Sequence, residues 1–456
     1  MRASPADLRA LLSPRSIAVV GASADPNKAG GMPIRLLREN GYAGALYPVH
    51  RTADEIQGLT AHASLDAIGS PVDLAVVAVP AAECEIVMEQ MARCGTRAAV
   101  MFTSGFAEVS EEGVRRQRRL GEIARDNGIA LLGPNCLGAM NLHERVFATF
   151  SPVVLGDAPA AGTVGLVSQS GAFGGYAFAL ARRAGIGIGH WITTGNEAGV
   201  QVADAIAWLA GEPSCQSILA YLEGARDMDR LRDALLAARQ AGKPVAMVKV
   251  GHTAVGAQAA KLHTGSDTGD AAEYRRLFDA CGVRSVRTIS ELFSAPVARE
   301  QLKVRTQQLP VAIFSISGGV GIMMADRAEE LGLALPPLLD DAARRLKNAI
   351  PFASTINPID VTGQVFSRPT VLVQALRDAA TCGRYRYVAV FLAAAGNAPG
   401  VWPLLQECIA QLRTDPSAAK LVLSGILTDE QTAWLHANGC ATFAEPAEAI
   451  EAVARR

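Results

Sequence analysis

The sequence predicts an α/β protein built from parallel, doubly wound sheets with helices on both faces. Apolar segments of strand length alternate with helical patterns along the chain, and the segments are almost continuously apolar, as at 72–80 and 97–106. Strands of this kind are buried on both faces, which is typical of parallel sheets. Several of them run directly into Gly- or Ser-rich turns. The 456 residues are enough for about three domains of ~150 residues each.

Composition excludes several classes of protein. Half of the residues are hydrophobic and only 19% are charged, which excludes global disorder. A net charge of −1 gives no electrostatic basis for binding nucleic acid or an anionic membrane. The eight cysteines show no CxxC pair and no Cys/His ligand spacing, so we expect reduced thiols, no zinc site and a cytoplasmic location. No apolar run approaches the ~20 residues of a membrane span.

The first strand, residues 16–23, breaks into a Gly/Ser turn that leads into a helical pattern closed by Gly41. The turn lacks the GxGxxG spacing, and the second strand ends with Pro48, His50 and Arg51 where an NAD site would carry an acidic residue. An NAD-dependent dehydrogenase, the activity that such an opening suggests, is therefore disfavoured. The basic residues suit a phosphorylated adenosine better.

Further strands at 72–80, 97–106 and 129–141 complete this first domain. Ligands of doubly wound sheets bind outside the carboxyl ends of the strands. The residues expected there are Gly21, Ser23, Lys28, Pro80, Ser104, Gly105, Phe106 and Asn135.

A Pro/Gly-rich link at 150–162 precedes a second α/β domain. It opens with a strand, the turn QSGAFGG and a helix. The free N–H groups of a helix start make this turn an anion site, formed by Ser168, Gln169, Ser170 and Gly171. The GxSxG pattern of a hydrolase nucleophile elbow is absent.

Two candidate catalytic residues lie in the same domain. Glu223 ends the apolar strand of 217–227, and His263 lies on a loop or short helix between the strand that ends at Gly251 and the next helix. Both are expected at the same sheet edge, where the carboxylate would fix the tautomer of the imidazole. The alternatives are an ordinary rim carboxylate and a packed or solvent-facing histidine.

A third α/β domain follows the polar linker 299–309. Residues 310–335 repeat the pattern of strand, Ser/Gly turn and long helix, and SISGGVG echoes SQSGAFGG. The second and third domains therefore resemble a weak internal repeat.

Taken together, a series of stretches resembles the nucleoside-diphosphate-forming acyl-CoA synthetases, the superfamily of succinyl-CoA synthetase, and most closely the α subunit of ADP-forming acetyl-CoA synthetase. The stretches, in family order, are GASADPNKAGG, GPNCLG, GLVSQSGAFGG, TTGNEAGVQVADAI, YLEGARD, KVGHTAVGAQAAKLHTGSDTG and NPIDVTG.

The resemblance implies a Rossmann-like coenzyme A-binding domain at 1–145 and two flavodoxin-like domains at 155–300 and 308–456. It implies the reaction of acid, CoA and ATP to acyl-CoA, ADP and phosphate. His263 matches the histidine that is transiently phosphorylated, and Glu223 matches the glutamate that orients it. The turn from Ser168 to Gly171 matches the phosphate cradle, to which we add Thr264 and Gly265 beside the histidine.

Two features depart from the family pattern. The family commonly reads SHTGSLAG, whereas Leu262 precedes the histidine here and Asp267 stands where an apolar residue is usual. No segment reads as an ATP-grasp domain. We therefore expect ATP or ADP and Mg to be bound by a β-subunit partner in a hetero-oligomer, with CoA and a small carboxylic acid as the other substrates. A CoA-binding regulatory or scaffold protein derived from the family is the alternative.

Overall fold

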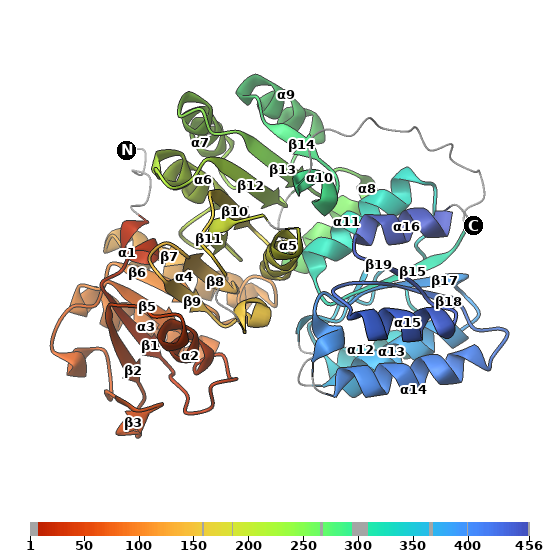
Figure 1. The fold of residues 1–456 in the computed structure, drawn as a ribbon, viewed down its shortest axis with the longest axis horizontal. Helices are drawn as coiled ribbons and strands as arrows, with labels where there is room; N and C mark the ends of the chain where they lie inside the picture. The colour runs from red at the N-terminus through yellow and green to blue at the C-terminus, as the bar shows by residue number, and fades with distance from the viewer. Residues whose placement is uncertain are drawn as a thin grey trace. The chain divides into compact units, whose positions relative to one another are not determined.

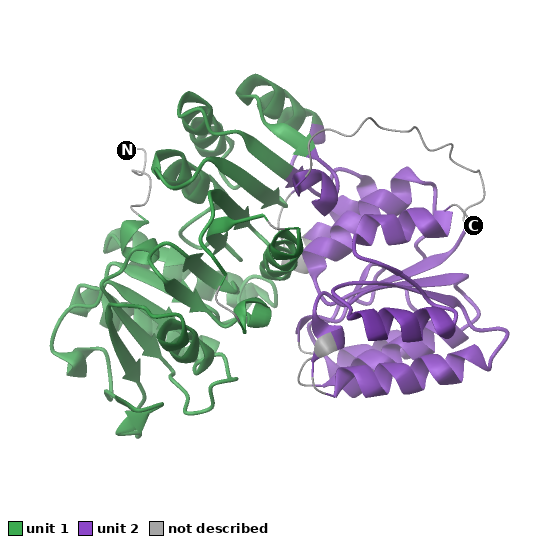
Figure 2. Ribbon diagram, viewed as in Figure 1, with its two compact units in different colours: residues 1–247, 272–285 green, residues 248–271, 286–456 purple. Residues whose placement is uncertain are grey.

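The computed structural model describes residues 8–156, 159–184, 186–264, 268–293, 309–363, 368–398 and 400–454, with the backbone alone at 261–264 and 397. These residues form two compact units. Unit 1 comprises residues 1–247 and 272–285, and unit 2 comprises residues 248–271 and 286–456 (Figure 2).

The first sheet of unit 1 has the order β2-β1-β5-β6-β7, and all its strands are parallel. The strands are β1 (Ser16–Val20), β2 (Ala45–Val49), β5 (Leu74–Val77), β6 (Ala98–Met101) and β7 (Ala130–Leu132). The helices around it (Figure 1) are α1 (Arg9–Leu12), α2 (Met32–Glu39), α3 (Ala81–Cys94) and α4 (Glu111–Asp126). β5 and β6 are buried at every position, so their apolar runs are explained by helices on both faces.

The second sheet has the order β14-β13-β12-β10-β11-β8-β9. Its strands are β8 (Gly138–Asn141), β9 (Val146–Thr149), β10 (Val164–Ser168), β11 (Ile188–Thr193), β12 (Ser217–Leu222), β13 (Val245–Lys249) and β14 (Arg284–Val286). Its helices are α5 (Gly171–Arg183), α6 (Val202–Gly211), α7 (Met228–Gln240) and α9 (Ala271–Cys281). The antiparallel pair β8–β9 extends the sheet beside β11.

The sheet of unit 2 has the order β16-β15-β17-β18-β19 and is parallel throughout. Its strands are β15 (Val311–Ser315), β16 (Ile359–Asp360), β17 (Tyr387–Phe391), β18 (Lys420–Ser424) and β19 (Ala441–Phe443). The helices of unit 2 are α8 (Ala254–Thr264), α10 (Ile289–Phe293), α11 (Gly318–Glu330), α12 (Asp340–Ala349), α13 (Pro369–Thr381), α14 (Val401–Arg413), α15 (Asp429–Ala437) and α16 (Pro446–Ala454).

The predicted fold class is confirmed. A small hairpin of β3 (Glu55–Ile56) and β4 (Leu59–Thr60) lies outside the three large sheets. Without the added pair β8–β9, all three sheets have the strand order 2-1-3-4-5, counted along the chain within each sheet. The order reverses at the first strand, which creates a switch point for a ligand in each sheet.

The division into units passes through β13, so the segment 248–271, which includes α8, groups with unit 2. α8 packs on α11. This division into two units does not test the three predicted domains, 1–145, 155–300 and 308–456, which stay a prediction. Within the described part of the chain, no helix combines the length and the apolar character that crossing a membrane requires.

Candidate active site

The predicted anion site lies where β10 passes into α5. The Ser168 hydroxyl donates to the carbonyl of Ser170 at 2.6 Å, and the Ser170 hydroxyl accepts from the N–H of Phe173 at 3.3 Å. Ser170 is therefore the N-cap of α5, as its extended backbone also shows. A Cβ on Gly171 would lie 2.8 Å from Cγ of Leu137, so only glycine fits at the first helical position.

Gln169 joins this turn to the end of β12. Its Oε1 accepts from the N–H groups of Glu223 at 2.7 Å and Gly224 at 3.1 Å, while its Nε2 donates to the carbonyl of Gly224 at 2.9 Å. The carboxamide thus acts as a bridge between two strand ends. Sequence reasoning gave Gln169 to the phosphate, but its side chain is engaged by the backbone at 223–224.

Glu223 lies directly after β12 and is 1% exposed. The Tyr221 hydroxyl donates to its Oε1 at 3.4 Å, and the Tyr221 ring packs on Phe173 with centroids 4.1 Å apart. Gln169 fixes the backbone of Glu223, so the carboxylate is held at the predicted sheet edge. A buried carboxylate needs polar partners, which suits a residue that receives a ligand or another side chain there.

The loop after β11 lies beside the same turn. The N–H of Thr194 donates to the carbonyl of Ser168, and the N–H of Gly195 donates to the carbonyl of Gln169. Glu197 in this loop is 3% exposed and has a left-handed backbone, with φ of 56°. Its Oε1 accepts from the Thr194 hydroxyl and from the N–H of Val202, each at 2.9 Å.

Burial raises the pKa of Glu197 to about 7, against the hydrogen bonds that lower it. The carboxyl therefore changes charge near neutral pH, beside the candidate anion turn. The sequence analysis gives Glu197 no role. The pair Asn–Glu follows a glycine in the sequence, but burial cannot be read from that pattern.

Arg226 supplies a cation close to this loop. Its Nη2 donates to the carbonyl of Asn196 at 2.7 Å, and its charge lowers the pKa of Glu197 against the effect of burial. Sequence reasoning gave Arg226 no role, although it follows Glu223 by three residues. An anion at the turn 168–171 would meet the N-terminus of α5, and Arg226 places a guanidinium beside the loop that hydrogen-bonds to this turn.

The predicted CoA residues follow β1, β5, β6 and β7, which lie side by side in the first sheet. Gly21 has φ of 82°, and a Cβ there would lie 2.6 Å from the carbonyl oxygen of Ala78. The loop that continues through Ser23 and Lys28 closes on itself through the Gly30 carbonyl, which accepts from the N–H of Ser23. Pro80 follows β5 and precedes α3. The β1 and β5 loops therefore flank the switch point of this sheet.

The other CoA candidates are more constrained than the sequence suggested. Phe106 is fully buried, so its ring belongs to the core. The N–H groups of Gly105 and Phe106 donate to the carboxylate of Glu108 at 2.6 and 3.2 Å, in the turn that Ser104 opens. Asn135 donates to Oδ1 of Asn196 at 3.1 Å, which links the carboxyl edge of the first sheet to the loop beside the predicted anion turn.

His263 lies in the last turn of α8, in unit 2, and its side chain is outside the described residues. The same holds for the side chain of Thr264 and for the whole of Gly265 and Asp267. The predicted pairing of His263 with Glu223, a residue of unit 1, stays a prediction. Across the residues that are described, no group of three metal-ligating side chains comes together.

Two family models match the chain. A CoA-binding domain matches residues 15–141, and a succinyl-CoA-ligase-like flavodoxin domain matches residues 161–298. The first contains the loops after β1, β5, β6 and β7. The second contains the turn 168–171, Glu223 and His263.

Relatives of the whole chain agree with these matches. The acetate–CoA ligase [ADP-forming] I subunit alpha of Pyrococcus furiosus is 33% identical over 453 residues, which cover 98% of this chain and 96% of the relative. The acetate–CoA ligase [ADP-forming] I of Archaeoglobus fulgidus is 36% identical over 77% of this chain, but the match covers 50% of that relative. A solved structure of the dinucleotide-forming acetyl-coenzyme A synthetase 1 from Ca. Korarchaeum cryptofilum, in complex with phosphate and ADP, is 27% identical, with a TM-score of 0.59 over 98% of this chain and 96% of that one.

Proposed function

This chain belongs to the family of ADP-forming acetate–CoA ligase α subunits, acid–thiol ligases that bind CoA, and we propose that it works through a phosphohistidine at His263. The observation that carries the proposal is the built turn at 168–171. Through the side chain of Gln169, it joins a helix N-terminus to the backbone of Glu223, whose carboxylate is buried.

Three steps account for the net reaction. The lone pair of a neutral His263 nitrogen forms a bond to the γ-phosphorus of ATP as the bond to the ADP oxygen breaks. An oxygen of the substrate carboxylate then attacks this phosphorus, the P–N bond breaks and acyl phosphate forms. Finally the CoA sulfur attacks the acyl carbon, phosphate leaves with the carbon–oxygen electron pair, and the thiol proton passes to phosphate or water.

The protein's part is placement and charge stabilisation. The N-terminus of α5 offers N–H groups and a positive dipole end to the transferring phosphoryl group. Glu223 would accept from one ring nitrogen of His263, so that the other carries the lone pair. Thr264 and Gly265, beside the histidine, complete the phosphate site in this proposal.

The first sheet would bind CoA along its carboxyl edge. The β1 loop, from Gly21 through Ser23 to Lys28, would receive the phosphorylated adenosine. Pro80 and the turn at 104–106 line the same edge, and Asn135 would set the end that faces Asn196. The hydrogen bond between Asn135 and Asn196 supports this direction, because it connects the CoA edge to the anion turn.

The nucleotide and Mg would be held by an ATP-grasp β subunit in a hetero-oligomer. The name of the Pyrococcus relative, subunit alpha, implies a second subunit. The match to the Archaeoglobus relative covers half of its length, which leaves room there for another domain. All eight cysteines are free thiols, which fits a cytoplasmic enzyme.

The test uses the reverse half-reaction, because it needs no partner. The chain is incubated with acetyl-CoA and ³²P-labelled phosphate, acetate being the acid named in the relatives. We expect an acid-labile, alkali-stable label on the chain that disappears in His263→Ala. A label of equal strength in His263→Ala would remove this residue from the mechanism. A chain that binds CoA and takes no label would instead be the CoA-binding regulatory protein.

A further inference from the structure

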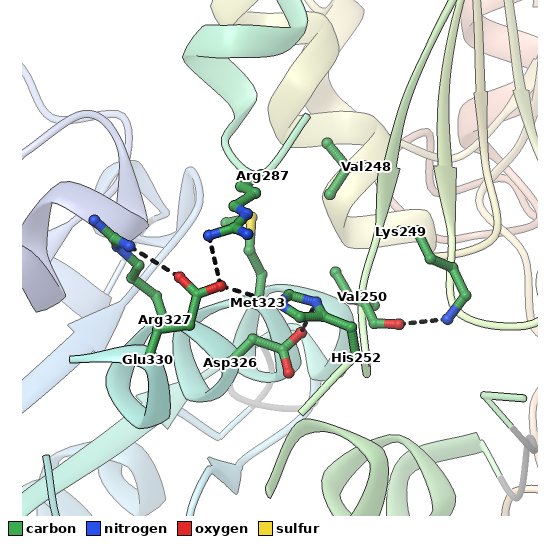
Figure 3. Close-up of a pocket in the computed structure, with 9 residues that line it drawn as sticks. All are labelled: Val248, Lys249, Val250, His252, Arg287, Met323, Asp326, Arg327 and Glu330. Carbon is green, nitrogen blue, oxygen red and sulfur yellow. Dashed lines mark hydrogen bonds and ion pairs between the residues drawn. The ribbon is translucent and has the colours of Figure 1, made fainter. Parts of the chain in front are cut away.

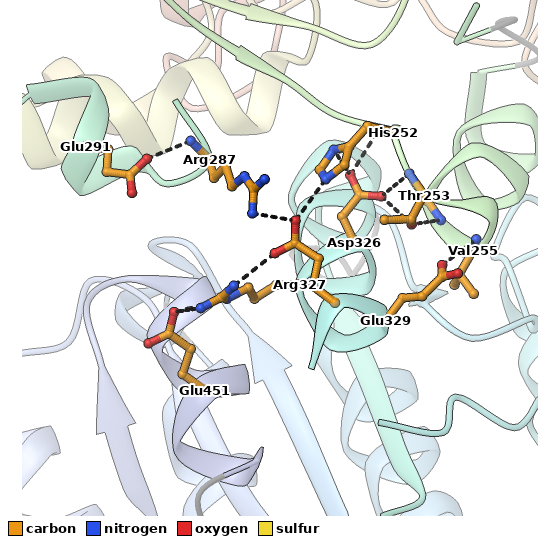
Figure 4. Close-up of polar contacts among 12 residues, drawn as sticks. His252, Thr253, Val255, Arg287, Glu291, Asp326, Arg327, Glu329 and Glu451 are labelled. Carbon is orange, nitrogen blue, oxygen red and sulfur yellow. Dashed lines mark hydrogen bonds and ion pairs between the residues drawn. The ribbon is translucent and has the colours of Figure 1, made fainter. Parts of the chain in front are cut away.

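The N-terminus of α8, the helix that ends in His263 and Thr264, is anchored on α11 by two carboxylates, of which Asp326 makes most of the hydrogen bonds. Asp326 is 2% exposed, and its Oδ2 accepts from the N–H of Gly251 at 2.9 Å. Its Oδ1 accepts from the N–H and the hydroxyl of Thr253 at 3.2 and 2.6 Å (Figure 4). One turn on, Glu329 accepts from the N–H of Val255 at 2.8 Å. Gly251 and Thr253 lie just before α8 and Val255 lies in its first turn, so α11 holds the entry to the helix. The Thr253 hydroxyl, itself bound to Asp326, accepts from the N–H of Gly256 at 3.0 Å and so satisfies one of the first N–H groups of α8.

His252 adds a second attachment. Its Nδ1 lies 3.2 Å from Asp326 and its Nε2 lies 3.1 Å from Glu330, the residue one turn further along α11 (Figure 3). Both ring nitrogens face carboxylate oxygens, an arrangement that favours the imidazolium form, in which both nitrogens carry a hydrogen. The hydrogen bonds to Asp326 and then Glu330 raise the pKa of His252 to about 9 against the effect of burial.

The charges around this ring hold the carboxylates in place. Glu330 also accepts from Arg287 at 2.8 Å and from Arg327 at 2.9 Å, and Arg327 pairs with Glu451 of α16. Burial alone would raise the pKa of Glu330, but its hydrogen bonds with His252 and Arg327 and the charge of Arg287 lower this pKa to about 2. Lys249, which lines a small pocket together with His252 and Glu330, donates to the Val250 carbonyl at 2.6 Å.

α8 and α11 pack closely at Gly256. A Cβ on Gly256, in the first turn of α8, would lie 1.8 Å from Oδ1 of Asp326 and 2.6 Å from its Cγ. Because Asp326 is held by its other hydrogen bonds, it cannot retreat without losing them. Gly256 therefore permits the close approach of α11 to the start of α8.

We propose that Asp326 and His252 are positioning residues of the ligase, which fix the register and orientation of α8 on α11 and thereby the place of His263. The proposal rests on the phosphohistidine function. His263 follows Ala254 by nine residues, which is ~14 Å along a helix that rises ~1.5 Å per residue. A slip by one residue would turn the histidine by ~100°.

An anchor is needed because α8 is short. It has 11 residues, below the ~12–15 at which an isolated helix is marginal in water. Its structure therefore depends on α11, and the polar contacts at its start determine which residue faces which. The side chains of Asp326 and His252 touch neither the reacting phosphorus nor CoA in this proposal, so they act only through the helix.

The experiment measures the rate at which the full chain takes up label from acetyl-CoA and ³²P-phosphate. We expect Asp326→Asn, His252→Gln and Gly256→Ala to slow labelling at least tenfold with the affinity for CoA unchanged. His252→Arg, which keeps a cation with two N–H arms, should restore the rate to within about threefold. Asp378→Asn is the matched control, because it removes a carboxylate that pairs with Arg345 elsewhere in unit 2.

The pH dependence separates positioning from general stability. The pKa of His252 is higher in the folded protein than its ordinary 6.5, so its attachment is complete below pH ~6.5 and is lost as the pH rises through about 9. The groups that face the ring are Asp326, Glu330 and Arg327 of α11, with Arg287 and Lys249 from the adjoining segments. Labelling of the unaltered chain should fall above pH 9, and in His252→Arg this fall should disappear.

Each outcome decides one point. If the unaltered chain takes no label at all, the phosphohistidine and the positioning role are both wrong. If it is labelled, and Asp326→Asn and His252→Gln label as fast as Asp378→Asn, only the positioning role is overturned. Amide hydrogen exchange of residues 254–264 gives a second readout without phosphate. It should speed up in Asp326→Asn and not in Asp378→Asn, and the opposite result contradicts the anchor.

Discussion

Unit 1 and unit 2 contain the same strand–turn–helix with the same hydrogen bonds. In unit 1, Ser168 donates to the carbonyl of Ser170, which caps α5. In unit 2, Ser315 donates to the carbonyl of Ser317, which caps α11. Each turn also bonds to the third strand of its sheet. The N–H of Gln169 donates to the carbonyl of Tyr221, and the N–H of Ile316 donates to the carbonyl of Phe391.

The side chains of the two turns differ. In unit 2, Ile316 occupies the position of Gln169, whose side chain bonds to the next strand end in unit 1. Ala393 likewise occupies the position of Glu223. A Ser-x-Ser-Gly turn therefore specifies a backbone and a helix cap. Chemistry depends on what the neighbouring strand supplies. The comparison predicts that equivalent substitutions in the two units will have equal effects on stability and unequal effects on activity.

The largest difference is expected at Glu223. Glu223→Gln keeps the shape but removes the charge that would select the imidazole tautomer, so turnover should fall at least ~100-fold, as for other orienting carboxylates. CoA affinity should not change. Steady-state rates with the β subunit, beside Ala393→Gln as the unit 2 control, measure this. Full activity of Glu223→Gln would make it an ordinary rim residue.

Gln169→Ile makes the first turn resemble the second. The N–H groups of Glu223 and Gly224 lose their acceptor, and each unsatisfied buried group costs ~1–3 kcal/mol. We expect the free energy of unfolding to fall by about 2–6 kcal/mol and labelling to slow about tenfold. Urea denaturation measures the first effect. A free energy of unfolding in Gln169→Ile equal to that of the unaltered chain would contradict the bridge.

A buried carboxyl in each unit should make stability depend on pH. Burial raises the pKa of Glu197 in unit 1 and of Glu445 in unit 2 to about 7, from an ordinary 4.5. The folded protein then binds more protons, so stability should decrease from pH ~4.5 to ~7 and level off above, by up to ~1.4 kcal/mol per pH unit for each group. Denaturation at several pH values should show a weaker slope in Glu197→Gln and in Glu445→Gln. An unchanged slope in either variant would mean that its carboxyl is ionised throughout.

The smallest effect concerns the two caps. Ser170→Ala and Ser317→Ala each remove one N-cap hydrogen bond, which stabilises a helix by ~1 kcal/mol. The loss of stability should be similar in the two variants, as thermal unfolding would show. Labelling should slow severalfold in Ser170→Ala alone, because only α5 is proposed to face phosphate. Slowing of the same size in Ser317→Ala would show that the activity loss merely follows stability.

The repeated turn also shows what the sequence could predict. Apolar runs followed by Ser–Gly turns were enough for the fold class and for the places of Ser168, Ser170 and Glu223. The bridge from Gln169 to Glu223 spans 54 residues, and its existence depends on the register between β10 and β12, which periodicity does not provide. For the same reason Glu197 was not recognised as a buried carboxyl. The contact of His252 with Asp326, 74 residues away, depends on how two helices pack.

The membership of α8 in unit 2 has a consequence for folding during synthesis. The last residue of α11 follows the last residue of α8 by 66 positions. At ~5–20 residues per second, the ribosome needs roughly 3–13 s to supply α11 after α8 has been made. A helix of 11 residues is at most marginally stable alone, so it is largely unfolded during that time. Unit 1 can build most of its sheets first, and the segment that ends in His263 acquires its structure only when α11 and Asp326 have been translated.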